Sequence, residues 1–247
     1  MKKLYLVLIC LILMPALSIA AEKKPPILAD TWAISPKAGQ GAEFYAALKE
    51  HIKFRKEKQD PRTWEIYNKV VGDDLNTYYI RSCCFQWGDI DTYNAWGDSA
   101  GTGKHFNSTV SQYVEHAGHN FSVIDQENSH WPEDTVANYV GVTSFKLKSG
   151  SGKSFEKAME SITKILIDNK WSESWSFFYG IEGDTNSMGL AFAYKDYADM
   201  APPEENAFKF VSKHMKSEKK AQKLFDDFSD GVESSTYTIY KKNTSLE

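Results

Sequence analysis

The sequence has no apolar run long enough to cross a membrane as a helix, which takes about 20 residues. Its apolar stretch from Leu4 to Met14 is shorter than that and follows Lys2-Lys3. A positive start, a short apolar core and the small residues of Ser18-Ile19-Ala20 are typical of a cleaved bacterial secretory signal. We therefore expect a signal peptide over residues 1–20 and a mature protein that is periplasmic or secreted, with no integral membrane segment.

Cysteine is also scarce, with three residues, of which Cys10 lies in the apolar signal stretch. Cys83 and Cys84 are adjacent, and neighbouring residues on a strand point to opposite faces of a sheet. We expect two separate buried thiols, and therefore a fold that no disulfide holds together. The absence of a C-x-x-C spacing also argues against a redox motif or a cysteine metal site.

There is no excess of basic residues. The chain has 29 Lys and Arg against 33 Asp and Glu, and losing Lys2 and Lys3 with the signal leaves 27 against 33, a net charge of −6. Nucleic-acid-binding domains carry a basic face, so we expect no nucleic-acid partner.

The sequence does contain a unit that occurs twice, at an offset of 111 residues. An alignment without gaps pairs identical residues over a helix-sized segment and a following turn. These pairs are Gly41 and Gly152, Phe44 and Phe155, Ala47 and Ala158, Lys53 and Lys164, Trp64 and Trp175, and Gly72-Asp73 with Gly183-Asp184. Each half must then be a unit that can pack against a copy of itself.

Hydrophobic periodicity predicts the same element order in both halves, namely strand, helix, hairpin and helix, and a closing strand is assigned in the second half. In the first half we expect strands over 30–35, 64–71 and 76–87, and helices over 41–59, from 93 onward and over 106–117. In the second half we expect strands over 139–148, 175–182, 188–194 and 236–240, and helices near 155–166 and 205–228. Pro132-Glu133-Asp134 marks the boundary between the halves.

This order is typical of a ferredoxin-like unit, an antiparallel sheet with two helices on one face. Apolar residues also occur on the other face of the sheet, which the partner repeat can cover. We therefore predict an α+β fold of two tandem ferredoxin-like repeats. The predicted segments are a flexible leader over 21–29, a first repeat over 30–131 and a second repeat over 137–242.

One segment of the first half is similar to a family motif. Tyr93-Asn94-Ala95-Trp96-Gly97-Asp98-Ser99, followed by His105, resembles the Y-x-x-W-x-x-S…H segment of antibiotic-biosynthesis-monooxygenase-like proteins. Together with the element order, this resembles the dimeric α+β barrel superfamily, which includes the stress-responsive barrel proteins, as a fused pair. The resemblance implies that the two repeats form an intramolecular α+β barrel. The insertion from Ala100 to Lys104 departs from the family spacing, and the second half lacks the Trp-Ser-His series. Because small members of the family dimerise, the resemblance implies a monomer with an internal pseudo-dimer.

Histidines cluster in the first half. Haem-degrading members of the family use a histidine on the second helix, so the resemblance implies His105 as a haem ligand or proton donor and Trp96 as a pocket residue. His116 and His119 are three residues apart and would share a face on a helix, which makes them candidates for a metal pair. The H-E-x-x-H pattern and a clear third ligand are missing, which favours surface or capping histidines and no metal.

Arg81 lies on a strand rich in aromatic residues. Together with Glu65 and Tyr67 it could form a polar group inside an apolar barrel, which suits the carboxylate of a ligand. The alternative is a cross-strand salt bridge between Glu65 and Arg81 with no binding role. The alignment without gaps sets Ser176, Phe178 and Phe192 against Glu65, Tyr67 and Arg81, so only the first half would carry this group.

Three functions follow from these features. The leading one is a periplasmic barrel that binds a small, largely apolar molecule, without evident catalysis and without a cofactor. The second is a haem-degrading or cofactor-independent monooxygenase-like enzyme. The third is a structural or protein-interaction module with a filled barrel. The sequence alone does not decide whether the protein is an enzyme.

Overall fold

The computed structural model describes residues 25–181 and 186–246. The predicted signal segment and the predicted turn at Gly183-Asp184 therefore lie outside the described residues. Among those described, no helix is both long and apolar enough to cross a membrane.

The chain alternates strands and helices in two successive sets. The first set is β1 (Ile27–Pro36), α1 (Gly41–Glu57), β2 (Glu65–Lys69), β3 (Tyr78–Phe85), α2 (Trp87–Ala100), α3 (Thr102–Thr109), a 3-10 turn η1 (Ser111–Tyr113) and β4 (Val114–His130). The second is β5 (Tyr139–Leu147), α4 (Gly152–Asp168), β6 (Trp175–Gly180), β7 (Ser187–Tyr194), α5 (Ala207–Met215), α6 (Glu218–Asp230), β8 (Val232–Lys242) and a 3-10 turn η2 (Thr244–Leu246). The first helices of the two sets, α1 and α4, each have 17 residues and begin 111 residues apart.

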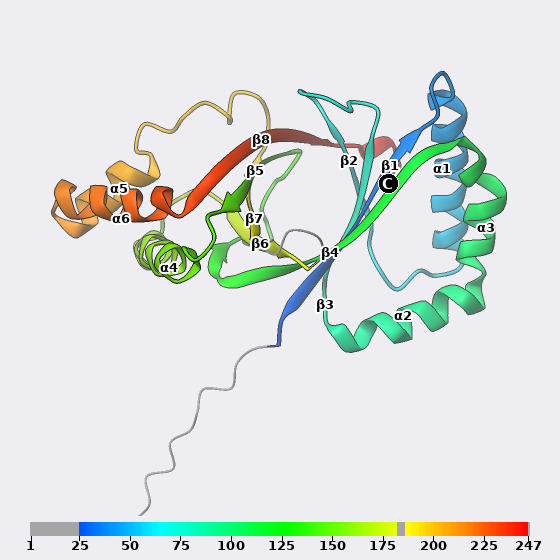
Figure 1. Cartoon of the computed structure of the whole chain (residues 1–247). Coiled ribbons are helices and arrows are strands. Elements are labelled where there is room, and N and C mark those ends of the chain that lie inside the picture. Colours follow the sequence, from blue (N-terminus) through cyan, green and yellow to red (C-terminus); the bar gives the residue numbers. More distant parts are fainter. Residues whose placement is uncertain (1–24, 182–185, 247) are drawn as a thin grey trace, which may run out of the picture.

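Eight strands close into an antiparallel barrel in the order β1-β3-β2-β8-β5-β7-β6-β4. Each half contributes four neighbouring strands in the same relative order, and the halves join where β2 pairs with β8 and β4 pairs with β6. Helices α1, α2 and α3 lie on one side of the strands and α4, α5 and α6 on the other (Figure 1). The predicted α+β barrel architecture is therefore confirmed.

Each half has its own hydrophobic core between helices and sheet. The core of the second half contains Phe155, Leu166, Trp171, Trp175 and Phe210, all at most 8% exposed. The core of the first half is smaller, and the C-terminal turn of the chain contributes Leu246 to it. Because Asn243 N–H also bonds Ile66 O at 2.7 Å, the end of the chain helps to close the barrel.

Several predicted boundaries are wrong. The helix predicted over 106–117 ends at Thr109, because the residues from Val114 onward pair with β1 as the long strand β4. Strand β1 begins at Ile27, inside the predicted leader. The single helix predicted over 205–228 is two helices, separated at Lys216 by a left-handed backbone (φ 51°).

The two adjacent cysteines form a disulfide, Cys83–Cys84, which corrects the prediction of two separate buried thiols. That prediction assumed a regular strand. The register between β1 and β3 instead shifts here, with Ala29 opposite Cys83 and Leu28 opposite Phe85, so Cys84 is the extra residue of a bulge. Its left-handed φ of 78° breaks the alternation of side chains and brings the two sulfur atoms together.

Candidate functional site

A cavity of about 1280 Å³ lies between the helices of the first half and the outer face of its sheet. Its walls are formed by α1, α2 and α3, by the segment joining α1 to β2, and by residues of β1, β3 and β4. Helix α2 buries none of its residues, so it covers the cavity without filling it. Apolar side chains such as Trp32, Ile80 and Phe106 line the walls beside several charged groups.

Polar residues keep this space open. At positions where the second half places buried apolar side chains, the first half places polar or charged ones that border the cavity. At the offset of 111 residues the pairs are His51 and Ile162, Arg55 and Leu166, and Asp60 and Trp171. The apolar members of these pairs fill the core of the second half.

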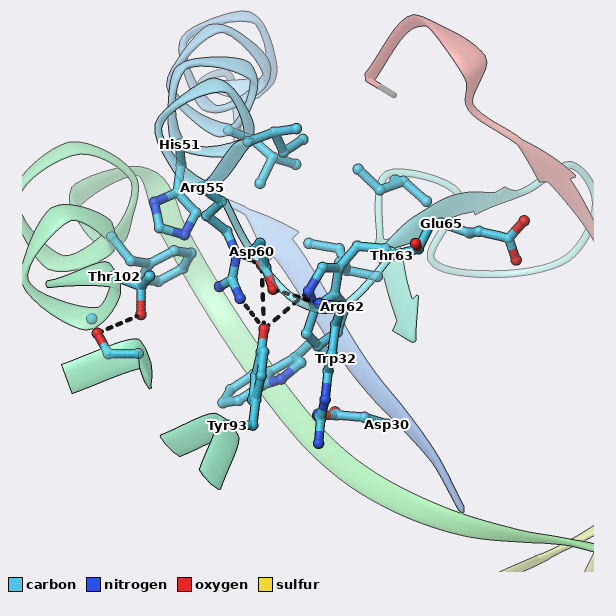
Figure 2. Close-up of a pocket in the computed structure, with 18 of the residues that line it drawn as sticks. Asp30, Trp32, His51, Arg55, Asp60, Arg62, Thr63, Glu65, Tyr93 and Thr102 are labelled. Carbon is cyan, nitrogen blue, oxygen red and sulfur yellow. Dashed lines mark hydrogen bonds and ion pairs between the residues drawn. The ribbon is translucent and has the colours of Figure 1, made fainter. Parts of the chain in front are cut away.

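The phenol of Tyr93, on α2, is the centre of one polar cluster (Figure 2). Its oxygen accepts hydrogen bonds from Arg55 Nη2 and, at 3.1 Å, from Trp64 Nε1, and it donates to Asp60 Oδ2 at 3.3 Å. Arg55 Nε also forms an ion pair with Asp60 Oδ2 at 2.7 Å. Burial raises the pKa of Tyr93 to about 12, against the opposing charge of Arg55, so the phenol stays protonated at neutral pH.

Arg62 lies beside this cluster, two residues after Asp60, whose Oδ1 accepts the Arg62 backbone N–H at 2.9 Å. The guanidinium packs against the rings of Phe85 and Tyr93, with Cζ 3.7 Å and 3.9 Å from the two ring centres. Its Nη1 forms an ion pair with Asp30 Oδ2 at 3.1 Å. The side chain is only 9% exposed, so contacts on several sides hold it in place.

Asp30 also contacts His119 through its other carboxylate oxygen. Its Oδ1 lies 2.8 Å from His119 Nε2, and the imidazole stacks on Trp32 with ring centres 4.0 Å apart. The register of β1 and β4 accounts for the contact, because it places Trp32 opposite His119 and Asp30 opposite Phe121. Burial raises the pKa of the Asp30 carboxyl, while His119 and Arg62 act to lower it. An ionised Asp30 that accepts the Nε2 hydrogen leaves Nδ1 of His119 as a base.

A second histidine on the cavity wall, His51, is 5% exposed, and its Nδ1 lies 3.1 Å from His105 Nδ1. Burial first, and then the charges of Arg55 and His105, lower the pKa of His51 to about 3. His51 is therefore neutral over the physiological pH range.

His105, the residue expected as a haem ligand, does not line the cavity. Its ring stacks on Phe54 at 4.0 Å and 16°, and its Nδ1 is close to His51 Nδ1 and to Thr109 Oγ1. This orientation does not fit an iron ligand in the cavity.

The residues predicted to form a polar group do come together, on the barrel-interior face of the sheet. Glu65 lies opposite Arg81 in the strand register, and Tyr67 donates a hydrogen bond to Glu65 Oε2 at 3.0 Å. Glu65 also pairs with Lys242 at 2.8 Å, and burial lowers the pKa of Arg81. Only Glu65 of the three borders the cavity, and Figure 2 shows its carboxylate directed away from Tyr93.

The register corrects the alignment of Arg81 with Phe192. Glu65 pairs with Arg81 and the aligned Ser176 pairs with Ala191, so the hairpin of the first half is one residue longer. The structural counterpart of Arg81 is therefore Ala191. The first half alone still carries the charged group.

The remaining predicted residues lie at the edge of the site or apart from one another. Trp96 stacks on Tyr93 with ring centres 5.3 Å apart, and it does not line the cavity. His116 and His119 are on strand β4 rather than on a helix, so they point to opposite faces and cannot form a metal pair. Within the described ranges no group of three potential metal-ligating side chains occurs.

Sequence reasoning missed the residues that carry most of the cavity chemistry, including Asp30, Arg55, Asp60 and Arg62. One signal was available. Charged residues occur in and just after the 41–59 segment at positions where the aligned half of the sequence has leucine and tryptophan.

Comparison with known proteins defines the fold. No protein-family model matches the sequence, and no curated protein is similar to it in sequence. A candidate monooxygenase from Lactobacillus acidophilus has a TM-score of 0.54 and 9% identity, covering 89% of this chain and 95% of its own. A candidate monooxygenase from Fusobacterium nucleatum has a TM-score of 0.54 and 12% identity, and its alignment covers 88% of this chain and 93% of the Fusobacterium chain. A mutant chlorite dismutase from Candidatus Nitrospira defluvii has a TM-score of 0.54 and 8% identity, and its alignment covers 89% of this chain and 92% of the dismutase chain.

These solved structures belong to the dimeric α+β barrel superfamily, and the present chain has the same α+β barrel fold. At such low sequence identity the similarity shows a shared fold and nothing about activity. The chemistry must be argued from the cavity itself.

Proposed function

We propose that the protein binds a small, largely apolar molecule in the cavity of its first half. The observation that carries this proposal is the cavity of about 1280 Å³ at the place where the second half has a packed core. Binding sites for small molecules are typically concave, mostly apolar and furnished with a few oriented polar groups. Trp32, Ile80 and Phe106 provide apolar contacts, and the Tyr93 and Asp30 clusters provide the polar ones.

The proposal extends to how the chain is built and where it works. We infer a fused pair of ferredoxin-like units that acts as a monomer, supported by the equal strand order of the halves and the 111-residue spacing of α1 and α4. A periplasmic or secreted location is supported by the N-terminal signal pattern and by the Cys83–Cys84 disulfide, a bond that persists in oxidising compartments. Sedimentation velocity and N-terminal sequencing of the exported protein test these two points.

Filling the cavity tests the binding proposal. The triple substitution His51→Ile, Arg55→Leu and Asp60→Trp gives the first half the residues of the second. A panel of aromatic compounds should quench tryptophan fluorescence and raise the Tm of the wild-type protein, and both effects should vanish in the variant. Glu57→Leu, at a position 62% exposed on the same helix, is the matched control and should bind like wild type.

Asn94→Trp provides a second way to fill the cavity. Asn94 lies on α2 and borders the cavity, and its replacement removes no charged group. A loss of binding in this variant would therefore come from the filled space and not from a missing charge. Circular dichroism checks that both variants fold. Wild-type protein that binds none of the compounds would contradict the proposal and favour a protein-interaction module. Undiminished binding in both folded variants would exclude this cavity as the binding site.

The Asp30–His119 pair favours a second candidate function, a cofactor-independent monooxygenase-like enzyme. A carboxylate that orients one imidazole nitrogen leaves the other to act as a general base, a role worth about 10²- to 10⁴-fold in rate. His119 would remove a proton from an activated CH₂ group. Reaction with dioxygen would then convert CH₂ to C=O and release one water molecule, which balances the two oxygen atoms.

Oxygen consumption with activated phenols and methylene compounds tests this candidate. His119→Gln should lower the rate about 100-fold or more. His116→Gln, a change on the opposite face of the same strand, should leave it unchanged. Compounds that bind without any oxygen uptake would identify the protein as a binder.

A further inference from the structure

One guanidinium nitrogen in the cavity wall has no acceptor. Arg62 Nη2 is buried, and no atom of residues 25–181 or 186–246 accepts a hydrogen bond from it. Buried donors of charged groups are nearly always paired, because leaving one unpaired forfeits its hydration without replacement. An unpaired one in the wall of a binding cavity therefore indicates a ligand atom as the missing acceptor.

The other contacts of Arg62 hold this nitrogen in place. The ion pair with Asp30 fixes Nη1, the rings of Phe85 and Tyr93 pack against the guanidinium, and Asp60 holds the backbone N–H. Arg55, the other guanidinium of the cavity, already bonds Asp60 and Tyr93. Arg62 is thus a buried cation of the site with one donor that no described residue accepts.

Arg62 shares its carboxylate partner with a second side chain. Asp30 is a single carboxylate that contacts both Arg62 and His119, and Arg55 and Asp60 cancel each other. The carboxylate of Asp30 is thus divided between two partners, and an anionic oxygen at Arg62 would give Nη2 an acceptor of its own.

Tyr93 is one of the side chains that cover Arg62. The tyrosine ring lies against the guanidinium, and the helix that carries it, α2, buries none of its own residues. A ligand atom reaches the buried Nη2 only after one of the side chains that cover it moves. The phenol is neutral, as its raised pKa requires, so it does not repel an incoming anion.

We propose that the molecule bound in this cavity is an acid, with an anionic oxygen on an aromatic or apolar body, and that Arg62 Nη2 is the donor that recognises this oxygen. A carboxylate is the simplest such group. The inference rests on the proposed binding function and names the chemical class of its ligand. Charge-assisted hydrogen bonds of this kind are roughly twice as strong as neutral ones.

Two probes of nearly equal shape test the inference, 2-naphthoate and its neutral amide 2-naphthamide, with dissociation constants measured by calorimetry. The wild-type protein should bind the carboxylate about tenfold or more tightly than the amide. In the double variant Arg62→Met and Asp30→Asn, which leaves no unpaired carboxylate, the two constants should become nearly equal. Lys56→Met removes a different cation from the same cavity and should preserve the preference.

The outcomes separate the two proposals. Equal binding of both probes by wild-type protein would overturn the acid inference and leave the binding function standing, as would a preference that survives the Arg62 change. Absence of binding by either probe would overturn the inference for this ligand class, and a neutral apolar compound that still bound would show that the cavity itself works.

A crystal structure of the wild-type complex needs no variant. It should show a carboxylate oxygen within hydrogen-bonding distance of Arg62 Nη2. A carboxylate bound elsewhere in the cavity would contradict the proposal.

Discussion

The two halves of this protein use the same strand order and place their first helices 111 residues apart, yet only one is solid between helices and sheet. In the second half, Leu166, Trp171 and Trp175 are at most 8% exposed. In the first half, Arg55, Asp60 and Trp64 occupy the corresponding positions and border a large cavity. A few exchanges of apolar for charged residues thus separate a half with a packed core from a half with a cavity.

The largest expected effect comes from exchanging one pair of equivalent residues. Leu166→Arg places a charge without a partner in the packed core of the second half, and we expect it to cost more than about 4 kcal/mol of unfolding free energy or to prevent folding. The reverse change, Arg55→Leu combined with Asp60→Asn so that no buried carboxylate is left without its cation, should alter that free energy by less than about 1 kcal/mol, because replacing both charges of a buried pair is close to neutral. Urea denaturation of both variants measures the contrast, and similar losses would show that the first half is packed as tightly as the second.

The two aligned tryptophans provide a smaller contrast. Trp175 is 2% exposed and donates to Asn128 O at 2.8 Å, so Trp175→Ala should cost about 3–5 kcal/mol. Trp64 lies at the cavity wall, where removal of its ring enlarges an existing space, so Trp64→Ala should cost less than about 2 kcal/mol. The midpoints and slopes of urea unfolding curves give the unfolding free energies of both variants and of the wild-type protein. A loss for Trp64→Ala equal to that for Trp175→Ala would contradict the comparison.

The barrel could be predicted from the sequence because its signals are periodic and local. Apolar spacing and turn residues predicted α1, α4 and the hairpins, and the element order together with the family resemblance predicted the closed architecture. Strand β4 was missed, because its long pairing with β1 depends on residues far apart in the chain.

The site could be predicted only in part, for a similar reason. Glu65, Tyr67 and Arg81 share a face as alternation along strands requires, but they lie on the barrel-interior face, whereas the cavity is on the outer one. Contacts such as Asp30 with His119 join residues 89 positions apart, and no local pattern indicates them.

His51 should make the first half sensitive to acid. The pKa of His51 is lowered to about 3 in the folded protein, whereas an unfolded chain has an ordinary value of about 6.5. Below about pH 6.5 the unfolded state therefore binds a proton that the folded state does not, and stability falls by up to about 1.4 kcal/mol per pH unit as the pH decreases toward 3.

The variant His51→Ile, which has the residue of the second half, should show a shallower fall between pH 6.5 and 4. Chemical denaturation at several pH values measures both slopes. His214→Gln, in the second half, is the control and should keep the wild-type slope. Parallel curves for wild type and His51→Ile would show that His51 is not the acid-sensitive group.

The smallest expected effect concerns a feature that the two halves share. Lys53 pairs with Glu57 at 3.8 Å and Lys164 pairs with Asp168 at 2.9 Å, at the same offset of 111 residues on α1 and α4. Both pairs are mostly exposed, so water screens them, and Lys53→Ala and Lys164→Ala should each change the unfolding free energy by less than about 0.5 kcal/mol. Equal, small values would show that the halves differ in what lies between helix and sheet and not on the outer surface of the helix. A loss above about 1 kcal/mol for either variant, measured by urea denaturation at low and high salt, would place part of the difference on that surface.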